Sequence, residues 1–151
     1  MNMAAKLFLM LNAIAFMLIG IKTTVDPVAA MADLDMSPQS VTESNEIRSI
    51  YGGMHFSFGV MMLAGAFLPA LTRHALWFCA AFLGGLVGGR LSSLLLDGQP
   101  NELANFLLVF ESVVLIAALC LQHGVRNNQN SPTRSEAVQQ TSTISSDGIG
   151  R

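Results

Sequence analysis

Four long apolar stretches dominate the pattern of hydrophobic and polar positions along the chain. They cover about residues 4–21, 47–71, 75–96 and 103–121, and the first is interrupted by Asn12. A helix needs about 20 apolar residues to cross a hydrocarbon layer of ~30 Å. The stretches lack the period-2 alternation of half-buried strands, and a helix in lipid satisfies its own backbone hydrogen bonds. The pattern therefore predicts an all-α fold, an integral membrane four-helix bundle.

The connections around the second stretch carry helix signals. Ser40 and Glu43 have the spacing of a capping box. The second helix is therefore expected to begin before it enters the membrane. Pro69 and a short polar turn over residues 72–74 separate the second and third stretches. Because this connection is short, we expect the helices on either side of it to be antiparallel neighbours.

The last connection and the C-terminal region complete the predicted organisation. Residues 97–101 form a turn in which Gly98 suits a left-handed conformation and Asn101 suits an N-cap. From residue 123 onward the chain is rich in Ser, Thr, Asn and Gln and has no periodic apolar face. We therefore predict a transmembrane domain over residues 1–122 and a disordered polar tail over residues 123–151.

Composition narrows the classes of protein that fit this pattern. Hydrophobic residues make up 52% of the chain and charged residues only 12%, against about 25% charged in an average soluble domain. The chain has eight Lys and Arg residues against ten Asp and Glu residues, which excludes a nucleic-acid binder. It has only two cysteines, which excludes a disulfide scaffold.

The basic residues near the ends of the stretches predict the orientation in the membrane. Lys6, Arg73 and Arg126 fall on one side, and Lys22 and Arg48 fall on the other among many acidic residues. Basic residues favour the cytoplasmic side, so we expect both termini to be cytoplasmic. The alternative for the first stretch is a secretory signal peptide, but its small residues at 30–32 lie far beyond the apolar run.

Two ionisable residues, Arg90 and Glu111, lie inside the predicted spans. An unpaired charge at the bilayer centre costs about 2.5–3.5 kcal/mol on the insertion scale. At 1.5 Å per residue, Arg90 lies roughly 9 Å and Glu111 roughly 12 Å below the same boundary, and His55 reaches a similar depth. Because a tight turn joins the third and fourth helices, we predict an Arg90–Glu111 ion pair.

Helical spacing adds further polar residues to this level of the bundle. Arg48, Tyr51 and His55 share one face of the second helix, and Arg90 and Asp97 share one face of the third. We therefore expect a polar cleft between the second, third and fourth helices, open toward the outer side. The candidate cleft residues are Glu46, Arg48, Tyr51, His55, Arg90, Asp97 and Glu111.

Two interpretations of this cluster stay open. In the first, Arg90 contacts a small anionic or carbonyl-bearing ligand and Glu111 holds Arg90 in place. In the second, the ion pair only fixes which helices are neighbours, and Glu46 and Arg48 are ordinary solvated charges near the interface.

Glycines form a second pattern on the predicted helices. Gly84, Gly85, Gly88 and Gly89 make two overlapping pairs of small residues four positions apart, a spacing that allows close helix contact. The second helix can also be approached closely at its glycines, which are Gly52, Gly53, Gly59 and Gly65. We predict that these glycines serve packing within the bundle, and the alternative is a homodimer.

Motifs for metals and common cofactors are missing from the sequence. It has no Cys-x-x-Cys, no His-x-x-x-His, no phosphate-binding loop, no dinucleotide fingerprint and no Gly-x-Ser-x-Gly elbow, and its three histidines are dispersed. We therefore expect no metal and no cofactor, and we assign no catalytic residue.

Several short motifs occur in a defined order. They are Glu-x-Arg-x-x-Tyr-Gly-Gly over residues 46–53, Gly-Arg at 89–90, Asp-Gly-Gln-Pro at 97–100, and Glu111. With them, roughly residues 5–122 resemble a bacterial membrane family, the domain of unknown function 4345, which looks related to the DoxX-like four-helix proteins. The resemblance implies a four-helix bundle in the bacterial inner membrane, and no established activity comes with it.

The sequence thus supports three expectations for function. The first is a small-ligand binding or transport-like module that uses the polar cleft. The second is a structural or assembly subunit that contacts another membrane protein. The third, suggested only by the analogy with DoxX-like proteins, is a component of a quinone-linked membrane oxidoreductase; an enzyme is therefore the least favoured class.

Overall fold

The helices predicted from the apolar pattern are present in the structure. It is a computed structural model that describes residues 3–130, with side chains described for residues 3–125. Within that part every regular element is helical and there is no strand. The elements are α1 (Met3–Val25), α2 (Pro27–Met31), η1 (Ala32–Leu34), α3 (Val41–Ile47), the π-helical η2 (Arg48–Met54), α4 (His55–Phe67), α5 (Pro69–Leu96) and α6 (Glu102–Asn130).

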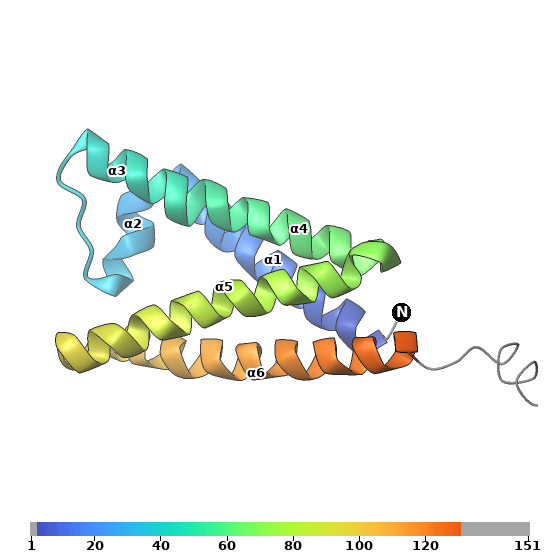
Figure 1. Cartoon of the computed structure of the whole chain (residues 1–151). Helices are drawn as coiled ribbons and strands as arrows, with labels where there is room; N and C mark the ends of the chain where they lie inside the picture. Colours follow the sequence, from blue (N-terminus) through green and yellow to red (C-terminus); the bar gives the residue numbers. More distant parts are fainter. Residues whose placement is uncertain (1–2, 131–151) are drawn as a thin grey trace, which may run out of the picture.

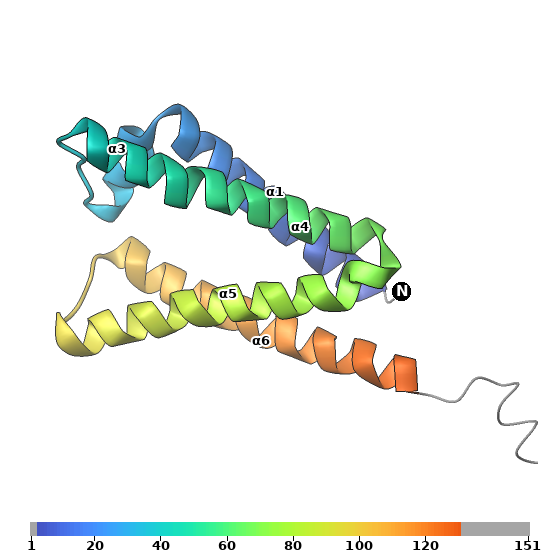
Figure 2. The ribbon, with the colours of Figure 1, turned by 45° about the horizontal axis from the view of Figure 1, so that its top comes forward.

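Four of the resulting rods are long and apolar enough to cross a membrane. They are α1, the continuous helix Val41–Phe67 that joins α3, η2 and α4, then α5, and residues Glu102–Val125 of α6. α1 packs along α4, and α5 packs along α6. Figures 1 and 2 show that these two pairs lie close together at the α4–α5 turn and splay apart toward the α2–α3 end. α1 and α6 touch each other at few points.

The second long helix begins with the predicted capping box. The Ser40 hydroxyl accepts a hydrogen bond from the Glu43 backbone N–H at 3.1 Å, and the Glu43 carboxylate accepts one from the Gln39 N–H. The first bond satisfies an N–H group that the first helical turn leaves without a partner, and the second binds the N–H of the residue before the N-cap. The helix therefore starts at Val41, ahead of the apolar stretch, as the spacing predicted.

The turn between the second and third long helices differs from the predicted one. The break falls at Leu68, whose backbone is extended (φ −104°, ψ 104°), and α5 starts directly at Pro69. A proline disfavours the helical conformation of the residue before it and is itself well suited to the first helical position. Residues 72–74, expected as a turn, are helical, because three polar residues do not interrupt a helix that has no proline or glycine among them.

The α5–α6 connection agrees with the sequence analysis. Gly98 has the left-handed conformation expected of it, with φ +96°. The Asn101 side-chain oxygen accepts a hydrogen bond from the Ala104 N–H at 2.9 Å, so Asn101 is the N-cap of α6. Its amide nitrogen donates to the Asp33 carbonyl at 3.2 Å and to the Asp35 carboxylate at 2.7 Å. Asn101 thereby ties the η1 segment to the start of α6.

The fourth long helix is longer than predicted. It continues to Asn130, whereas the sequence analysis placed a disordered tail from residue 123. Residues 123–130 contain no proline, and a helix that leaves the apolar layer can expose polar side chains on every face. The helix therefore extends beyond the predicted start of the tail at residue 123. The rest of the expected tail, residues 131–151, lies outside the described residues.

The core lies where the helices converge. Leu9 of α1, Met62 of α4, and Leu76 and Cys79 of α5 are fully buried. Small residues let α1 approach α4 closely: a Cβ on Gly59 would lie 2.8 Å from the Ala13 carbonyl oxygen. Toward the α2–α3 end the two helix pairs separate, and this separation leaves room for the site described next.

Candidate functional site

Arg90 and Glu111 form the predicted ion pair. Arg90 Nε donates to Glu111 Oε2 at 2.8 Å, and Arg90 Nη2 donates to Glu111 Oε1 at 3.1 Å. This two-point geometry is the strong form of a guanidinium–carboxylate contact. Glu111 is only 8% exposed, so its charge depends on Arg90 for compensation. The pair joins the two arms of the α5–α6 hairpin, as the matched depths predicted.

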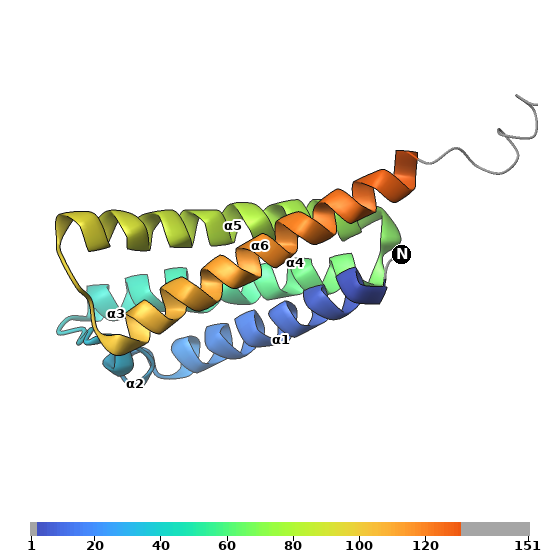
Figure 3. The ribbon, with the colours of Figure 1, turned by 90° about the horizontal axis from the view of Figure 1, so that it is seen from below.

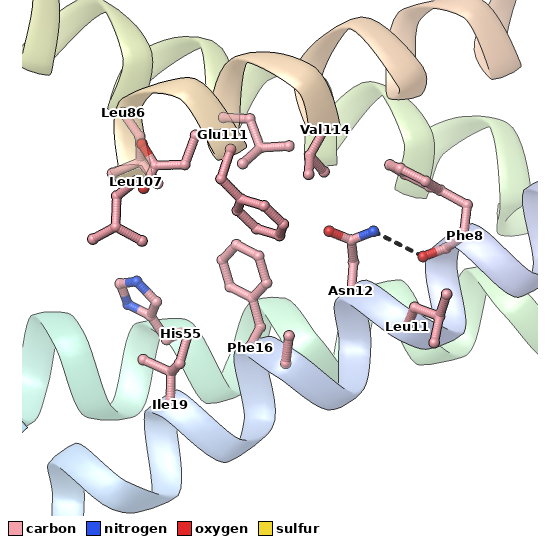
Figure 4. A pocket seen from close by; sticks show the side chains of 13 residues that line it. Phe8, Leu11, Asn12, Phe16, Ile19, His55, Leu86, Leu107, Glu111 and Val114 are labelled. Atoms are coloured by element: carbon pink, nitrogen blue, oxygen red, sulfur yellow. Dashed lines mark hydrogen bonds between the residues drawn. The ribbon is translucent and has the colours of Figure 1, made fainter. Parts of the chain in front are cut away.

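A cavity of about 340 Å³ lies beside this pair. Figure 4 shows side chains of α1, including Asn12, Phe16 and Ile19, facing Leu107 and Glu111 of α6 across it. Leu83 and Leu86 of α5 and His55 of α4 complete the lining. Three of the thirteen lining residues carry polar side chains, namely Asn12, His55 and Glu111.

The cavity differs from the expected cleft in position and in character. The cleft was expected between the second, third and fourth helices, but α1 forms a whole wall of the cavity (Figure 3 shows α1 and α6 from below). Its lining is mostly apolar, not polar. Glu111 lines the cavity and Arg90 does not. Arg90 therefore contacts the Glu111 carboxylate from outside the cavity lining. The expectation that Arg90 contacts a ligand stays a prediction.

His55 is held in one orientation by a hydrogen bond and by aromatic rings. Its Nδ1 lies 3.1 Å from the Ile50 carbonyl oxygen, five residues earlier, in the π-helical η2. The ring stacks on Phe16 at 5.5 Å between centroids and on Tyr51 at 5.8 Å, and meets the edge of Phe82 at 5.6 Å. Because a carbonyl oxygen only accepts, Nδ1 carries the hydrogen, and in the neutral ring Nε2 is then an acceptor.

Asn12 is a cavity residue that the candidate set omitted. Its amide nitrogen donates to the Phe8 carbonyl at 2.8 Å. In Figure 4 the amide oxygen points away from Phe8, on the cavity side. The signal was available in the sequence, because a polar amide inside an apolar span is unusual and commonly faces other helices. The helix that carries it, however, was not expected to face the cleft.

The polar groups of the cavity therefore have one property in common. One N–H of the Asn12 amide and the Nδ1–H of His55 donate to backbone carbonyls, and Glu111 has no donor when ionised. A carboxylate has about four lone-pair directions, and Arg90 uses only part of them. Asn12, His55 and Glu111 thus all line the same apolar cavity, and each side chain carries a hydrogen-bond acceptor.

The other candidate residues are not brought into this cavity. Arg48 Nε donates to the Thr24 carbonyl at 3.1 Å, so Arg48 caps the C-terminal turn of α1, where a cation is favourable. Asp97 accepts from the Ser93 hydroxyl at 2.9 Å at the end of α5. Glu46 and Tyr51 line a separate hollow on the second long helix. Tyr51 reaches the cavity only through its stacking on His55.

The predicted packing glycines separate into two groups. A Cβ on Gly52 would lie 2.5 Å from Thr24 Oγ1, so this glycine packs against α1 as expected. A Cβ on Gly53 would meet only the Arg48 carbonyl oxygen, at 3.8 Å. A Cβ on any of the four α5 glycines would meet no atom within 4 Å, so the prediction of internal packing is wrong for Gly84, Gly85, Gly88 and Gly89. Contact of this face with a second copy stays a prediction.

Comparison with protein families identifies the family of this chain but assigns no activity to it. Residues 4–122 match a family described as Domain of unknown function (DUF4345). The chain belongs to the DUF4345 family. The matched region of this DUF4345 protein includes Asn12, His55, Arg90 and Glu111. Neither a curated protein nor a solved structure matches the chain, and the relationship to DoxX-like proteins stays a prediction.

No metal centre is found among the residues that the structure describes. These residues contain no group of three or more His, Cys, Asp or Glu side chains placed to hold an ion. Cys79 is a buried free thiol of the core, and Cys120 is an exposed one on α6.

Proposed function

We propose that this DUF4345 protein is a multi-pass membrane protein that binds a small hydrogen-bond-donating molecule in the cavity between α1, α4, α5 and α6. Four helices of sufficient length and apolarity support the membrane location. The distribution of basic residues supports cytoplasmic termini, and the family resemblance supports the bacterial inner membrane.

One observation carries the choice of ligand. The polar side chains among the lining residues are those of Asn12, His55 and Glu111, and each of them carries a hydrogen-bond acceptor. A hydroxyl or N–H group that enters the cavity can donate to these acceptors, and a hydrogen bond to a charged group such as the Glu111 carboxylate contributes about 1.5–3 kcal/mol. An anionic ligand, expected from the sequence, would lie against the Glu111 carboxylate and is not proposed.

A matched pair of small probes tests this proposal. The purified protein in detergent is heated with para-butylphenol, which has a donor, or with para-butylanisole, its methyl ether, which has none. Ligand that binds only the folded state raises stability by about 2.7 kcal/mol at a concentration of 100 Kd. We expect the phenol to raise the unfolding temperature and the ether to have a much smaller effect.

Substitutions in the cavity provide the control. Asn12→Leu removes one acceptor and keeps the size of the side chain, and we expect it to lower the preference for the phenol over the ether. Thr42→Val, on the second long helix outside this cavity, should leave the preference unchanged. Equal stabilisation by phenol and ether in the unsubstituted protein would rule out donor recognition.

A second candidate function is supported by the ion pair itself. Arg90 and Glu111 satisfy each other and join α5 to α6, which is what a purely structural subunit of a membrane assembly needs. The double variant Arg90→Met with Glu111→Leu distinguishes the two candidates. If it folds and complements a deletion strain fully, the structural role is correct. If it folds, loses the phenol preference and fails to complement, the binding role is correct.

A further inference from the structure

The mouth of the cavity is formed by apolar side chains on α1 and α6. Leu11 and Ile19 of α1 are 60% and 48% exposed, and Phe110 of α6 is 53% exposed, yet all three line the cavity. α1 and α6 touch at few points, so packing between them does not close this side. The cavity therefore opens sideways, between two long helices.

The depth of this opening follows from the helix rise. Phe110 lies eight residues after the start of α6, and Leu11 eight residues after the start of α1. At 1.5 Å per residue both side chains are roughly 12 Å from the nearest helix end. In a layer of ~30 Å they face acyl chains, not water.

The end of the bundle toward α2 is covered instead. The η1 segment is tied to the N-cap of α6 by the two Asn101 hydrogen bonds to Asp33 and Asp35. In Figure 3 α2 lies beside the start of α6 and the end of α1. The cleft was expected to open toward this aqueous end, and the covering segment makes the lateral mouth the more direct route.

The lining restricts what can enter by such a route. Ten of the thirteen lining residues have apolar side chains, which favours an apolar molecular body at about 25 cal/mol per Å² buried. Arg90 already compensates the charge of Glu111, so a neutral donor suits the remaining lone pairs of the carboxylate and a cation is not required. An uncharged molecule that carries a hydroxyl group on an apolar body meets both conditions.

From these observations, and resting on the proposed binding function, we infer that the gap between α1 and α6 is a lateral portal for a membrane-dissolved lipophilic alcohol. The hydroxyl of this alcohol donates to the acceptors of Glu111, His55 or Asn12. Its apolar chain lies between Phe16 and Phe110 and extends past Leu11 or Ile19 into the bilayer.

Photo-crosslinking in lipid nanodiscs tests the portal. The probes are a diazirine-labelled dodecanol and its methyl ether, added to the full-length protein at equal membrane concentration. We expect the alcohol to label peptides of α1 and α6 about fivefold more than the ether, the effect of one additional hydrogen bond of about 1 kcal/mol. Equal labelling by the two probes would overturn the alcohol as the occupant, because a plain acyl chain would then suffice.

Two substitutions on α1 separate the portal from the cavity. Leu11→Trp enlarges a rim side chain, whereas Leu18→Trp enlarges a side chain that is also 60% exposed but does not line the cavity. We expect Leu11→Trp to reduce labelling several-fold at short times and Leu18→Trp to have no effect. Equal effects of the two changes would overturn the portal.

The outcome is independent of the test of the proposed function. If para-butylphenol still stabilises the detergent-solubilised protein while Leu11→Trp leaves labelling in nanodiscs unchanged, the portal is wrong and the binding site stands. If neither the phenol nor the alcohol binds, the binding function itself is wrong. Circular dichroism of each variant shows whether the helices are intact, and Phe110→Ala, which widens the mouth, should speed labelling.

Discussion

Glu111 differs from the other acidic residues of the chain in its surroundings. It is buried between apolar side chains of α1 and α6, and its charge is compensated by one cation, Arg90. The planar guanidinium contacts both carboxylate oxygens, which also fixes the direction in which the carboxylate faces the cavity. Glu111 can therefore be at once a structural partner of Arg90 and an acceptor for a ligand.

The ion pair makes a prediction at the level of single residues. Glu111→Ala or Arg90→Ala leaves one charge without its partner in an apolar site, and we expect each to lower the free energy of unfolding by about 3 kcal/mol. Arg90→Lys keeps the charge but loses the two-point contact, so its loss should be smaller. Unfolding in mixed detergent micelles measures these values.

The double variant is the control for this prediction. Arg90→Met with Glu111→Leu removes both charges, and we expect stability close to that of the unsubstituted protein, since buried ion pairs are often replaced by apolar pairs without loss. A double variant as unstable as the single ones would show that the pair contributes stability beyond mutual compensation.

At the level of elements, two helices carry glycines with opposite consequences. Gly59 on α4 lies so close to α1 that a Cβ would meet the Ala13 carbonyl oxygen and the Met17 backbone nitrogen, at 2.8 and 3.0 Å. Gly88 on α5 has no atom within 4 Å of the same position. The two residues share an identity and a helical setting, but only the first lies in an interface of this chain.

Gly59→Ala and Gly88→Ala form a matched pair of substitutions. We expect Gly59→Ala to cost about 1–3 kcal/mol, because α1 and α4 must separate to admit the methyl group. Gly88→Ala should leave stability unchanged or raise it by up to about 1 kcal/mol, since alanine is the better helix former. Reversible unfolding followed by circular dichroism measures both.

The two outcomes also bear on the expected homodimer. A loss at Gly88 as large as that at Gly59 would show that another chain covers this face of α5. If Gly88→Ala does not lower the free energy of unfolding of protein at high concentration in a bilayer, this face of α5 contacts lipid.

On the scale of the whole molecule, the helix pairs make the arrangement asymmetric. α1 with α4 and α5 with α6 converge at the α4–α5 turn and separate at the other end (Figure 2). The connections α1–α3 and α5–α6 meet at that other end, where Asn101 contacts Asp35. Both connections therefore lie on the same side of the proposed membrane, as a four-span topology requires.

This arrangement predicts which side of the membrane each connection faces. In a variant without Cys79 and Cys120, a cysteine in place of Gln99 should react with a membrane-impermeant thiol reagent added outside intact cells. A cysteine in place of Arg73, near the α4–α5 turn, should react only after the membrane is opened. The reverse pattern would contradict cytoplasmic termini, and Ser37→Cys should behave as Gln99→Cys does.

Local features of this protein could be predicted from its sequence because they depend on neighbours along the chain. Hydropathy over about 20 residues locates a span, and Ser40, Gly98 and Asn101 act within a few residues of themselves. Arg90 and Glu111 are far apart along the chain. A short turn and similar depths in the two arms of the hairpin nevertheless constrain their contact almost as strongly as closeness in sequence would. The helix ends at Leu68 and Asn130 differ from the predicted ones, because polar residues do not by themselves end a helix.

The cavity could not be predicted from the sequence, because it depends on how each helix is rotated about its axis and on which helices pack against each other. Each residue turns an α-helix by about 100°, so small differences in rotation decide whether Gly88 faces a neighbour or lipid. They also decide whether Asn12 faces α6. The π-helical turns before His55 change this rotation along the second long helix. Hydropathy does not report this rotation, because lipid and a neighbouring helix are equally apolar. Only the packed structure shows that α1 forms a wall of the cavity beside the Arg90–Glu111 pair.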